Sequence, residues 1–120
     1  MKTLLAAIAL LFSATVARAD PVSDEIAYLI DFVRHSQCTF IRNGTEYTGN
    51  QAADHVQEKY NYYKDDIKTV EDFIERAASK SILSGQPYQV RCADGKTVPA
   101  ADWIRAEDTV YRARLGATAN

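Results

Sequence analysis

The sequence predicts an α+β fold of about four helices packed on a small antiparallel sheet that is built around a β-hairpin. Apolar residues recur at helical spacing in four stretches, most of them preceded by capping residues. Between the first two stretches the residues alternate with a period of two and meet Asn43-Gly44, a strong signal for a hairpin turn. Helices gathered around a short antiparallel sheet are typical of the α+β class.

The first helix is predicted to begin at Ser23, a good N-cap, with Asp24 and Glu25 suiting the positive end of the helix dipole. Its apolar positions fall on one face, as in a helix that packs against a core. These positions are Ile26, Leu29, Ile30 and Val33.

The hairpin follows the first helix, with strands over residues 38–42 and 45–47. A capping box, Thr48 with Gln51, then opens a second helix directly after the returning strand. The expected apolar stripe of this helix is Ala52, Val56, Tyr60 and Tyr63, and the charged residues 64–66 end it in a loop.

A second capping box, Thr69 with Asp72, opens the third helix. Its apolar stripe is Val70, Phe73, Ile74 and Ala77. A polar loop leads from there to a strand over residues 88–92 and a short strand over residues 96–98.

The fourth helix is expected to start near Pro99, whose fixed φ suits a first helical turn, and to stop at Gly116. Its expected buried residues are Trp103, Ile104, Val110 and Tyr111. Glu107 and Asp108 interrupt this stripe.

Residues 1–19 have the pattern of a cleavable signal peptide. Lys2 provides a positive start, an apolar run follows from Leu4 to Phe12, and small residues stand at Ala17 and Ala19. The run is well short of the ~20 apolar residues that span a bilayer. We therefore expect export to the periplasm, cleavage before Asp20, and a single α+β domain over residues 20–120.

Removing Lys2 and Arg18 with the leader changes the formal net charge from −2 to −4. The chain has no basic tract and no basic stripe with interleaved aromatics, so nucleic acid is not an expected partner. No later stretch is apolar enough to cross a membrane. No cofactor is expected, and the expected partner is an unidentified periplasmic protein or small molecule.

The two cysteines, Cys38 and Cys92, are expected to form a disulfide, because exported proteins commonly oxidise such a pair. A reactive thiol pair would favour a close Cys-x-x-Cys spacing. In the chain-entropy model a loop of this length contributes roughly 4 kcal/mol to stability.

Candidate catalytic and metal-binding groups are sparse. His55 lies at the edge of the second helix's apolar stripe, where it is either a general base or a packed histidine that hydrogen-bonds to the hairpin. Ser79, Ser81 and Ser84 lack the Gly-x-Ser-x-Gly pattern of a nucleophile elbow. Two histidines twenty residues apart do not form a recognisable metal-ligand set, so no metal site is predicted. The acidic pairs are interpreted as solvated faces and cap charges: Asp65-Asp66, Glu71-Asp72 and Glu107-Asp108.

Several segments together resemble a family of small exported proteobacterial proteins known only as a domain of unknown function. These segments are CTFIRNGTEYTG, AADHVQEKY, TVEDFIERAASKS, SGQPYQVRC and ADWIRAE, in that order. The resemblance covers residues 24–114 and implies an exported single domain, compatible with a Cys38–Cys92 bridge. Asp108 departs from it, because an apolar residue is expected at this position of the last helix.

A second, local resemblance concerns the segment SGQPY, Ser84 to Tyr88. It is similar to the short loop with which some periplasmic lysozyme inhibitors enter the enzyme's cleft. The resemblance implies a polar loop that presents a hydroxyl to catalytic carboxylates.

Three functions follow as hypotheses: a periplasmic binding or interaction module without catalysis, a hydrolase that uses His55, and a lysozyme-inhibitor-like protein. For the first we expect one polar recess. Its expected border is Arg42, Tyr47, His55, Ser84 and Tyr88. The alternative is that His55 and Tyr88 only hydrogen-bond to loop backbone and lock the helices to the sheet.

Overall fold

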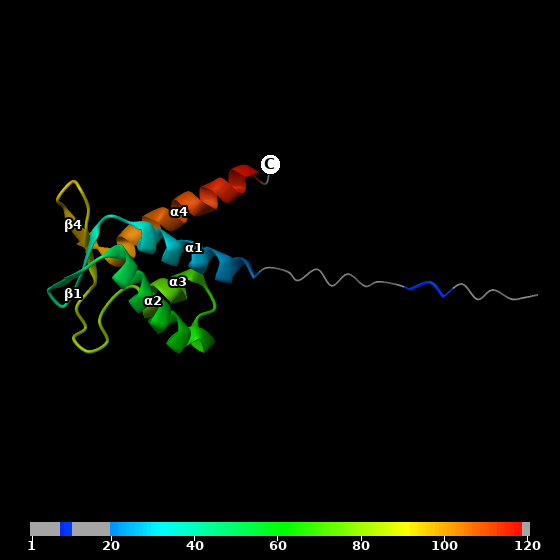
Figure 1. The fold of residues 1–120 in the computed structure, drawn as a ribbon, viewed down its shortest axis with the longest axis horizontal. Helices are drawn as coiled ribbons and strands as arrows, with labels where there is room; N and C mark the ends of the chain where they lie inside the picture. Colours follow the sequence, from blue (N-terminus) through cyan, green and yellow to red (C-terminus); the bar gives the residue numbers. More distant parts are fainter. Residues whose placement is uncertain (1–7, 11–19, 119–120) are drawn as a thin grey trace, which may run out of the picture.

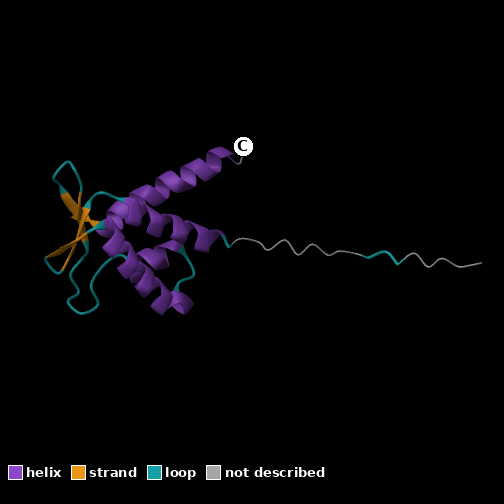
Figure 2. Ribbon diagram, in the orientation of Figure 1, coloured by secondary structure: helices purple, strands orange, loops and turns teal. Residues whose placement is uncertain are grey.

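A computed structural model describes residues 8–10 and 20–118 of the chain, and the expected signal peptide lies almost entirely outside these residues. The predicted α+β class is confirmed. Four helices lie to one side of a four-stranded antiparallel sheet (Figure 1; Figure 2). The elements in chain order are α1 (Pro21–His35), β1 (Thr39–Arg42), β2 (Thr45–Tyr47), α2 (Gly49–Tyr63), a 3-10 turn (Lys64–Asp66), α3 (Val70–Ala77), β3 (Gln89–Arg91), β4 (Thr97–Pro99) and α4 (Ala100–Thr118).

The sheet has the strand order β2-β1-β3-β4, with every neighbouring pair antiparallel. The predicted hairpin turn forms at its edge, where Asn43 and Gly44 adopt φ values of 51° and 77°. Positive φ at both turn residues is what a two-residue type I′ turn requires, and Asn and Gly tolerate it best. Tyr47 returns opposite Phe40.

Both predicted capping boxes are confirmed. Thr48 and Gln51 exchange side-chain and backbone hydrogen bonds at the start of α2, as Thr69 and Asp72 do at the start of α3. The first helix begins earlier than predicted: Asp20, not Ser23, is the N-cap, and its carboxylate accepts from the Val22 amide at 3.1 Å. Pro21 occupies the first turn of the helix, where the backbone N–H that proline lacks would have no partner within the helix.

The predicted start of the last helix near Pro99 is confirmed, whereas its predicted end at Gly116 is wrong. Pro99 is the final residue of β4, and α4 begins directly after it. Gly116 does not stop the helix, because it does not adopt the positive φ of a glycine cap, and the helix continues to Thr118. Figure 1 shows the end of α4 projecting away from the sheet.

The core lies between the sheet and the helices. Its largest fully buried side chains are Phe73, Ile26, Leu29, Ile74, Val33 and Val90. All predicted apolar positions of α1 and α3 are buried. The buried face of α2 is turned from the predicted stripe: Ala53, Val56 and Lys59 are buried, whereas Tyr60 and Tyr63 are only half-buried. On α4, Ile104 is buried as predicted, but Val110 is exposed.

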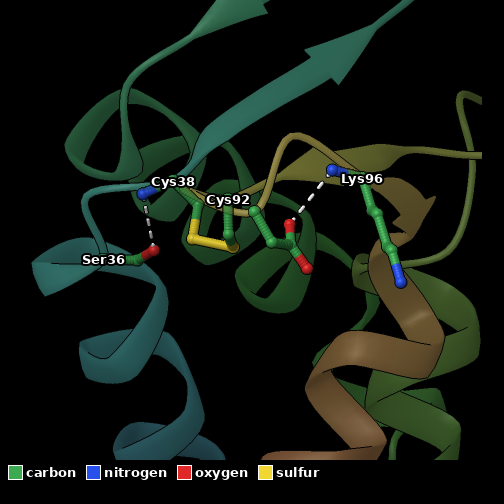
Figure 3. Close-up of a disulfide and its surroundings, with 5 residues drawn as sticks. Ser36, Cys38, Cys92 and Lys96 are labelled. Carbon is green, nitrogen blue, oxygen red and sulfur yellow. Dashed lines mark hydrogen bonds between the residues drawn. A yellow bond between two sulfur atoms is a disulfide. The ribbon is translucent and has the colours of Figure 1, made fainter.

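The predicted disulfide joins Cys38 and Cys92, whose Cα atoms are 4.3 Å apart (Figure 3). Thr39 of β1 pairs with Arg91 of β3, so the two cysteines occupy the next opposed position of the same register. The Ser36 hydroxyl accepts from the Cys38 amide at 3.0 Å and fixes the turn between α1 and β1 (Figure 3). The bridge thus closes the end of the β1–β3 pair that adjoins α1.

Candidate binding site

The strand register places three polar side chains on the face of the sheet that meets the helices. Arg42 lies two residues after the buried Phe40, and Tyr47 is the cross-strand partner of Phe40. Because Ile41 pairs with Gln89, the preceding residue, Tyr88, lies opposite Arg42. Side chains two residues apart on a strand share a face, so Arg42, Tyr47 and Tyr88 converge.

The second helix brings His55 to this group. Its cap, Thr48, directly follows β2, so the helix folds back over the hairpin within its first two turns. Arg42 Nη1 lies 2.9 Å from His55 Nδ1 and 3.0 Å from Nε2, and His55 Nε2 lies 3.1 Å from the Tyr88 hydroxyl. Arg42 also donates from Nη2 to the Tyr47 hydroxyl at 3.1 Å.

Lys59 completes the cluster and was not predicted from the sequence. It lies one helical turn after His55, is only 9% exposed, and donates to the Tyr88 hydroxyl at 3.0 Å and to the Lys80 carbonyl oxygen at 2.9 Å. Its ammonium also lies 4.9 Å from the centre of the Tyr88 ring. The sequence did contain one signal for this contact: Lys59 follows His55 by four residues, so the two side chains lie on the same face of the helix.

Except for Lys59, these side chains border a pocket of about 280 Å³ between the hairpin, α2 and the start of α4. Arg42, Tyr47, His55 and Tyr88 line it together with buried apolar side chains. The buried apolar residues of the lining are Val33, Phe40, Val56, Ala78, Ala100 and Ile104, and the half-buried Ile41 and Ala52 line it as well.

Ser84 is not part of this pocket's lining. Its hydroxyl lies 2.5 Å from Asn43 Oδ1, to which it donates, and accepts from the Gln86 amide at 3.2 Å. Ser81 likewise accepts from the Asn43 side chain at 3.2 Å. Both serines therefore tie the 79–87 loop to the hairpin turn, and the structure brings together four of the five expected border residues.

Two cations act on the histidine at the border of the pocket. Burial, together with the charges of Arg42 and Lys59, lowers the pKa of His55. Burial and the charge of Arg42 also lower the pKa of Lys59, and burial raises the pKa of Tyr88.

Within the described part of the chain, no carboxylate forms a salt bridge with Arg42 or Lys59, although Asp54 and Glu58 line the mouth. Asp54 instead pairs with Arg34 at 2.8 Å.

The histidine contacts constrain its proton. An arginine only donates, so the ring nitrogen that accepts from Arg42 carries no proton. In the neutral tautomer with a bare Nδ1, that nitrogen accepts from Arg42 while Nε2–H donates to the Tyr88 hydroxyl. Tyr88 then receives hydrogen bonds from both His55 and Lys59, which leaves its own hydroxyl proton available to a ligand.

Within the part of the chain that the structure describes, His55 hydrogen-bonds with neither a carboxylate nor a serine. Among the described residues, the side chain of His55 hydrogen-bonds with Arg42 and Tyr88, and the serines of the 79–87 loop bind the hairpin turn. A general base of a hydrolase is commonly oriented by an acceptor and placed beside its nucleophile. Over residues 8–10 and 20–118, no group of three or more His, Cys, Asp or Glu is placed to hold a metal ion.

The expectation of a solvated charge is wrong for one acidic residue of α4. Asp108 is not a solvated charge: its side chain is 13% exposed and packs beside Glu25, which is 12% exposed, with Arg112 reaching both at 3.3 and 3.1 Å. One carboxylate oxygen, Asp108 Oδ1, is buried without a hydrogen-bond partner. Helix α4 packs on α1 at this point. The burial of Asp108 depends on this packing and cannot be read from two adjacent acidic residues in the sequence.

The sequence pattern of one protein family matches residues 20–112, most of the chain. This chain belongs to the DUF5329 family, a family of unknown function. The match begins and ends within a few residues of the bounds expected from the sequence segments.

A relative of this DUF5329 protein is the uncharacterized protein YfeK of Salmonella typhimurium, which is 34% identical over 62 residues. The aligned part spans about half of each chain, 52% in both cases. No solved structure matches the chain significantly. None of the described helices is both long and apolar enough to cross a membrane.

Proposed function

We propose that this DUF5329 protein is an exported, periplasmic binding module that takes a small ligand into the pocket between the hairpin and α2. The observation that carries the proposal is the pocket's composition: buried apolar side chains form much of its lining, and a few convergent polar groups stand at its border. Small-molecule sites generally combine these two features.

Two features support the periplasmic setting. Residues 1–19 have the pattern of a signal peptide, and the Cys38–Cys92 disulfide suits an oxidising compartment. The proposed location and the proposed pocket are independent, so each has its own test.

The hydrolase and inhibitor hypotheses receive less support. Within the described chain, His55 contacts Arg42 and the Tyr88 hydroxyl, and it has neither a carboxylate nor a serine as a hydrogen-bond partner. The Ser84–Pro87 segment is exposed, as an inhibitor loop requires, but Tyr88 is buried and the Ser84 hydroxyl donates to Asn43. Because its hydroxyl proton is donated to Asn43, Ser84 does not present a free hydroxyl to the catalytic carboxylates of a lysozyme.

A capture experiment tests the binding proposal. The disulfide-bonded protein is purified under native conditions from periplasmic extract and denatured, and the small molecules that it releases are identified by mass spectrometry. Ala52→Phe places a large side chain in the pocket wall, whereas the matched variant Ala27→Phe places it on the exposed face of α1.

We expect the wild-type protein and Ala27→Phe to release a compound that Ala52→Phe does not. Melting curves of both variants show that the fold is kept. The same released compounds from all three proteins, or none from any of them, would contradict the proposal.

A further inference from the structure

The side-chain cluster around His55 contains more hydrogen-bond donors than acceptors. The guanidinium of Arg42 and the ammonium of Lys59 carry several N–H donors and no acceptor. The acceptors in contact with them are one His55 nitrogen, the hydroxyls of Tyr47 and Tyr88, and the Lys80 carbonyl oxygen. Since both hydroxyls also bring a proton of their own, the donors of the cluster outnumber its acceptors, and two of the donor groups, Arg42 and Tyr88, line the pocket.

The same cluster lacks a negative charge. Lys59 is only 9% exposed, and a buried charge is costly unless it is paired. Neither cation has a salt-bridge partner among the residues that the structure describes. Asp54 is held by Arg34, and Glu58 is an exposed residue of α2. A bound anion would supply both the missing acceptors and the missing charge.

The remainder of the pocket limits what the anion can be attached to. Apart from this border, the lining is largely made of buried apolar side chains such as Phe40, Val56 and Ile104. At about 280 Å³ the pocket lies just below the range of roughly 300–1,000 Å³ that is typical of drug-sized ligands. The carboxylates of Asp54 and Glu58 at the mouth disfavour a ligand with more than one negative charge.

We infer that the pocket binds a small monocarboxylate with an apolar body, whose carboxylate accepts from Arg42 and the Tyr88 hydroxyl while the body contacts Phe40, Val56 and Ile104. The inference rests on the proposed function and specifies its ligand. Arginine suits this role because its planar N–H groups match the two oxygens of a carboxylate.

Three probes of similar size separate the contribution of a single negative charge from those of the apolar ring and of a second negative charge. Benzoate has the charge and the apolar ring, benzamide keeps the shape without the charge, and phenyl phosphate carries more than one negative charge near neutral pH. Binding of each is followed by NMR of ¹⁵N-labelled, disulfide-bonded protein, using the amide signals of residues that line the pocket.

We expect benzoate to cause saturable shifts at these residues, with benzamide and phenyl phosphate each binding roughly tenfold more weakly. Arg42→Gln should reduce the affinity for benzoate to that for benzamide. Its matched control is Arg91→Gln, which removes an arginine of the same sheet that pairs with Glu46 and does not line the pocket. Benzoate should also raise the pKa of His55 in an NMR titration, which benzamide should not do, because a nearby anion favours the imidazolium.

The outcomes distinguish this inference from the proposed function. Equal affinity for benzoate and benzamide, or a preference for phenyl phosphate, would overturn the monocarboxylate assignment, as would an absence of saturable binding by all three probes. A neutral compound released by the wild-type protein and lost in Ala52→Phe would overturn it too, while leaving the proposed function intact. Unaltered benzoate binding by Arg42→Gln would refute the assigned contact.

Discussion

His55 contacts Arg42 and Tyr88 at the same time, so its replacement separates a role in binding from a role in locking α2 to the sheet. In His55→Gln the side-chain amide keeps one donor and one acceptor but does not reproduce the ring's position. We predict that the melting temperature changes by at most about two degrees while benzoate binding weakens several-fold. Thermal melts and NMR titrations measure the two effects. A drop of several degrees with unchanged binding would instead show that the histidine is a structural lock.

Asp108 makes the attachment of α4 sensitive to pH. Burial, followed by the hydrogen bond and the charge of Glu25, raises its pKa from 3.8 to about 6, against a smaller opposing effect of Arg112. The folded protein therefore holds a proton up to about pH 6 that the unfolded chain releases near pH 3.8. Because the folded state binds more protons in this window, the free energy of unfolding falls as pH rises through it, by on the order of 3 kcal/mol.

Asp108→Asn removes the ionisation and keeps a polar group of similar shape. We predict a melting temperature several degrees above wild type at about pH 7.5 and little difference at about pH 4. Melting curves across this range, with Asp102→Asn as a control for losing an exposed carboxylate of the same helix, measure the effect. A constant offset between Asp108→Asn and wild type at every pH would contradict the proton linkage.

At the scale of elements, Gly49 decides how closely α2 approaches α1. A Cβ at this position would lie 2.5 Å from the Val33 carbonyl oxygen and 2.6 Å from that of Ser36, closer than real contacts allow. Both oxygens belong to backbone at the end of α1, so neither is a flexible side chain that can give way. We predict that Gly49→Ala destabilises the fold by about 1–3 kcal/mol, in spite of alanine's better helix propensity.

The matched control for Gly49→Ala is Gly116→Ala, on α4, where an added Cβ meets no atom within 4 Å. That variant should be stabilised by up to about 1 kcal/mol, as expected for glycine replaced by alanine in a helix. Chemical denaturation of the two variants gives both values. Similar changes in both would show that the close approach of the helices has no energetic consequence.

Elements with local causes were predictable from the sequence. The Asn43-Gly44 turn needs only two residues that tolerate positive φ, and each capping box needs only residues three apart. Lys59 was missed because its burial depends on acceptors at Lys80 and Tyr88, distant in the sequence. Ser84 was misplaced for the same kind of reason: the path of its loop is set by contacts with the hairpin turn that no local pattern specifies.

At the scale of the whole molecule, the disulfide joins the two halves of the chain at the sheet. It closes a loop of 54 residues and holds the β1–β3 register that sets Arg42 opposite Tyr88. We predict that reduction lowers the melting temperature by several degrees, because the bridge contributes roughly 4 kcal/mol in the chain-entropy model. Benzoate binding should weaken with it. Two reactive thiols in unreduced, denatured protein would contradict the prediction.

Export gives the last prediction, which concerns where the mature chain begins. Asp20 is both the first residue after the expected cleavage site and the N-cap of α1, where its carboxylate accepts from the Val22 amide at 3.1 Å and the Ser23 hydroxyl at 3.0 Å. Cleavage before Asp20 keeps this cap, whereas cleavage one residue later removes it, at about 0.5–2 kcal/mol of stability. The carboxylate also offsets the new α-amino charge at the positive end of the helix dipole. We therefore expect intact-mass measurement of periplasmic protein to show an N-terminus at Asp20. A protein that retains Met1, recovered in the membrane fraction, would refute cleavage.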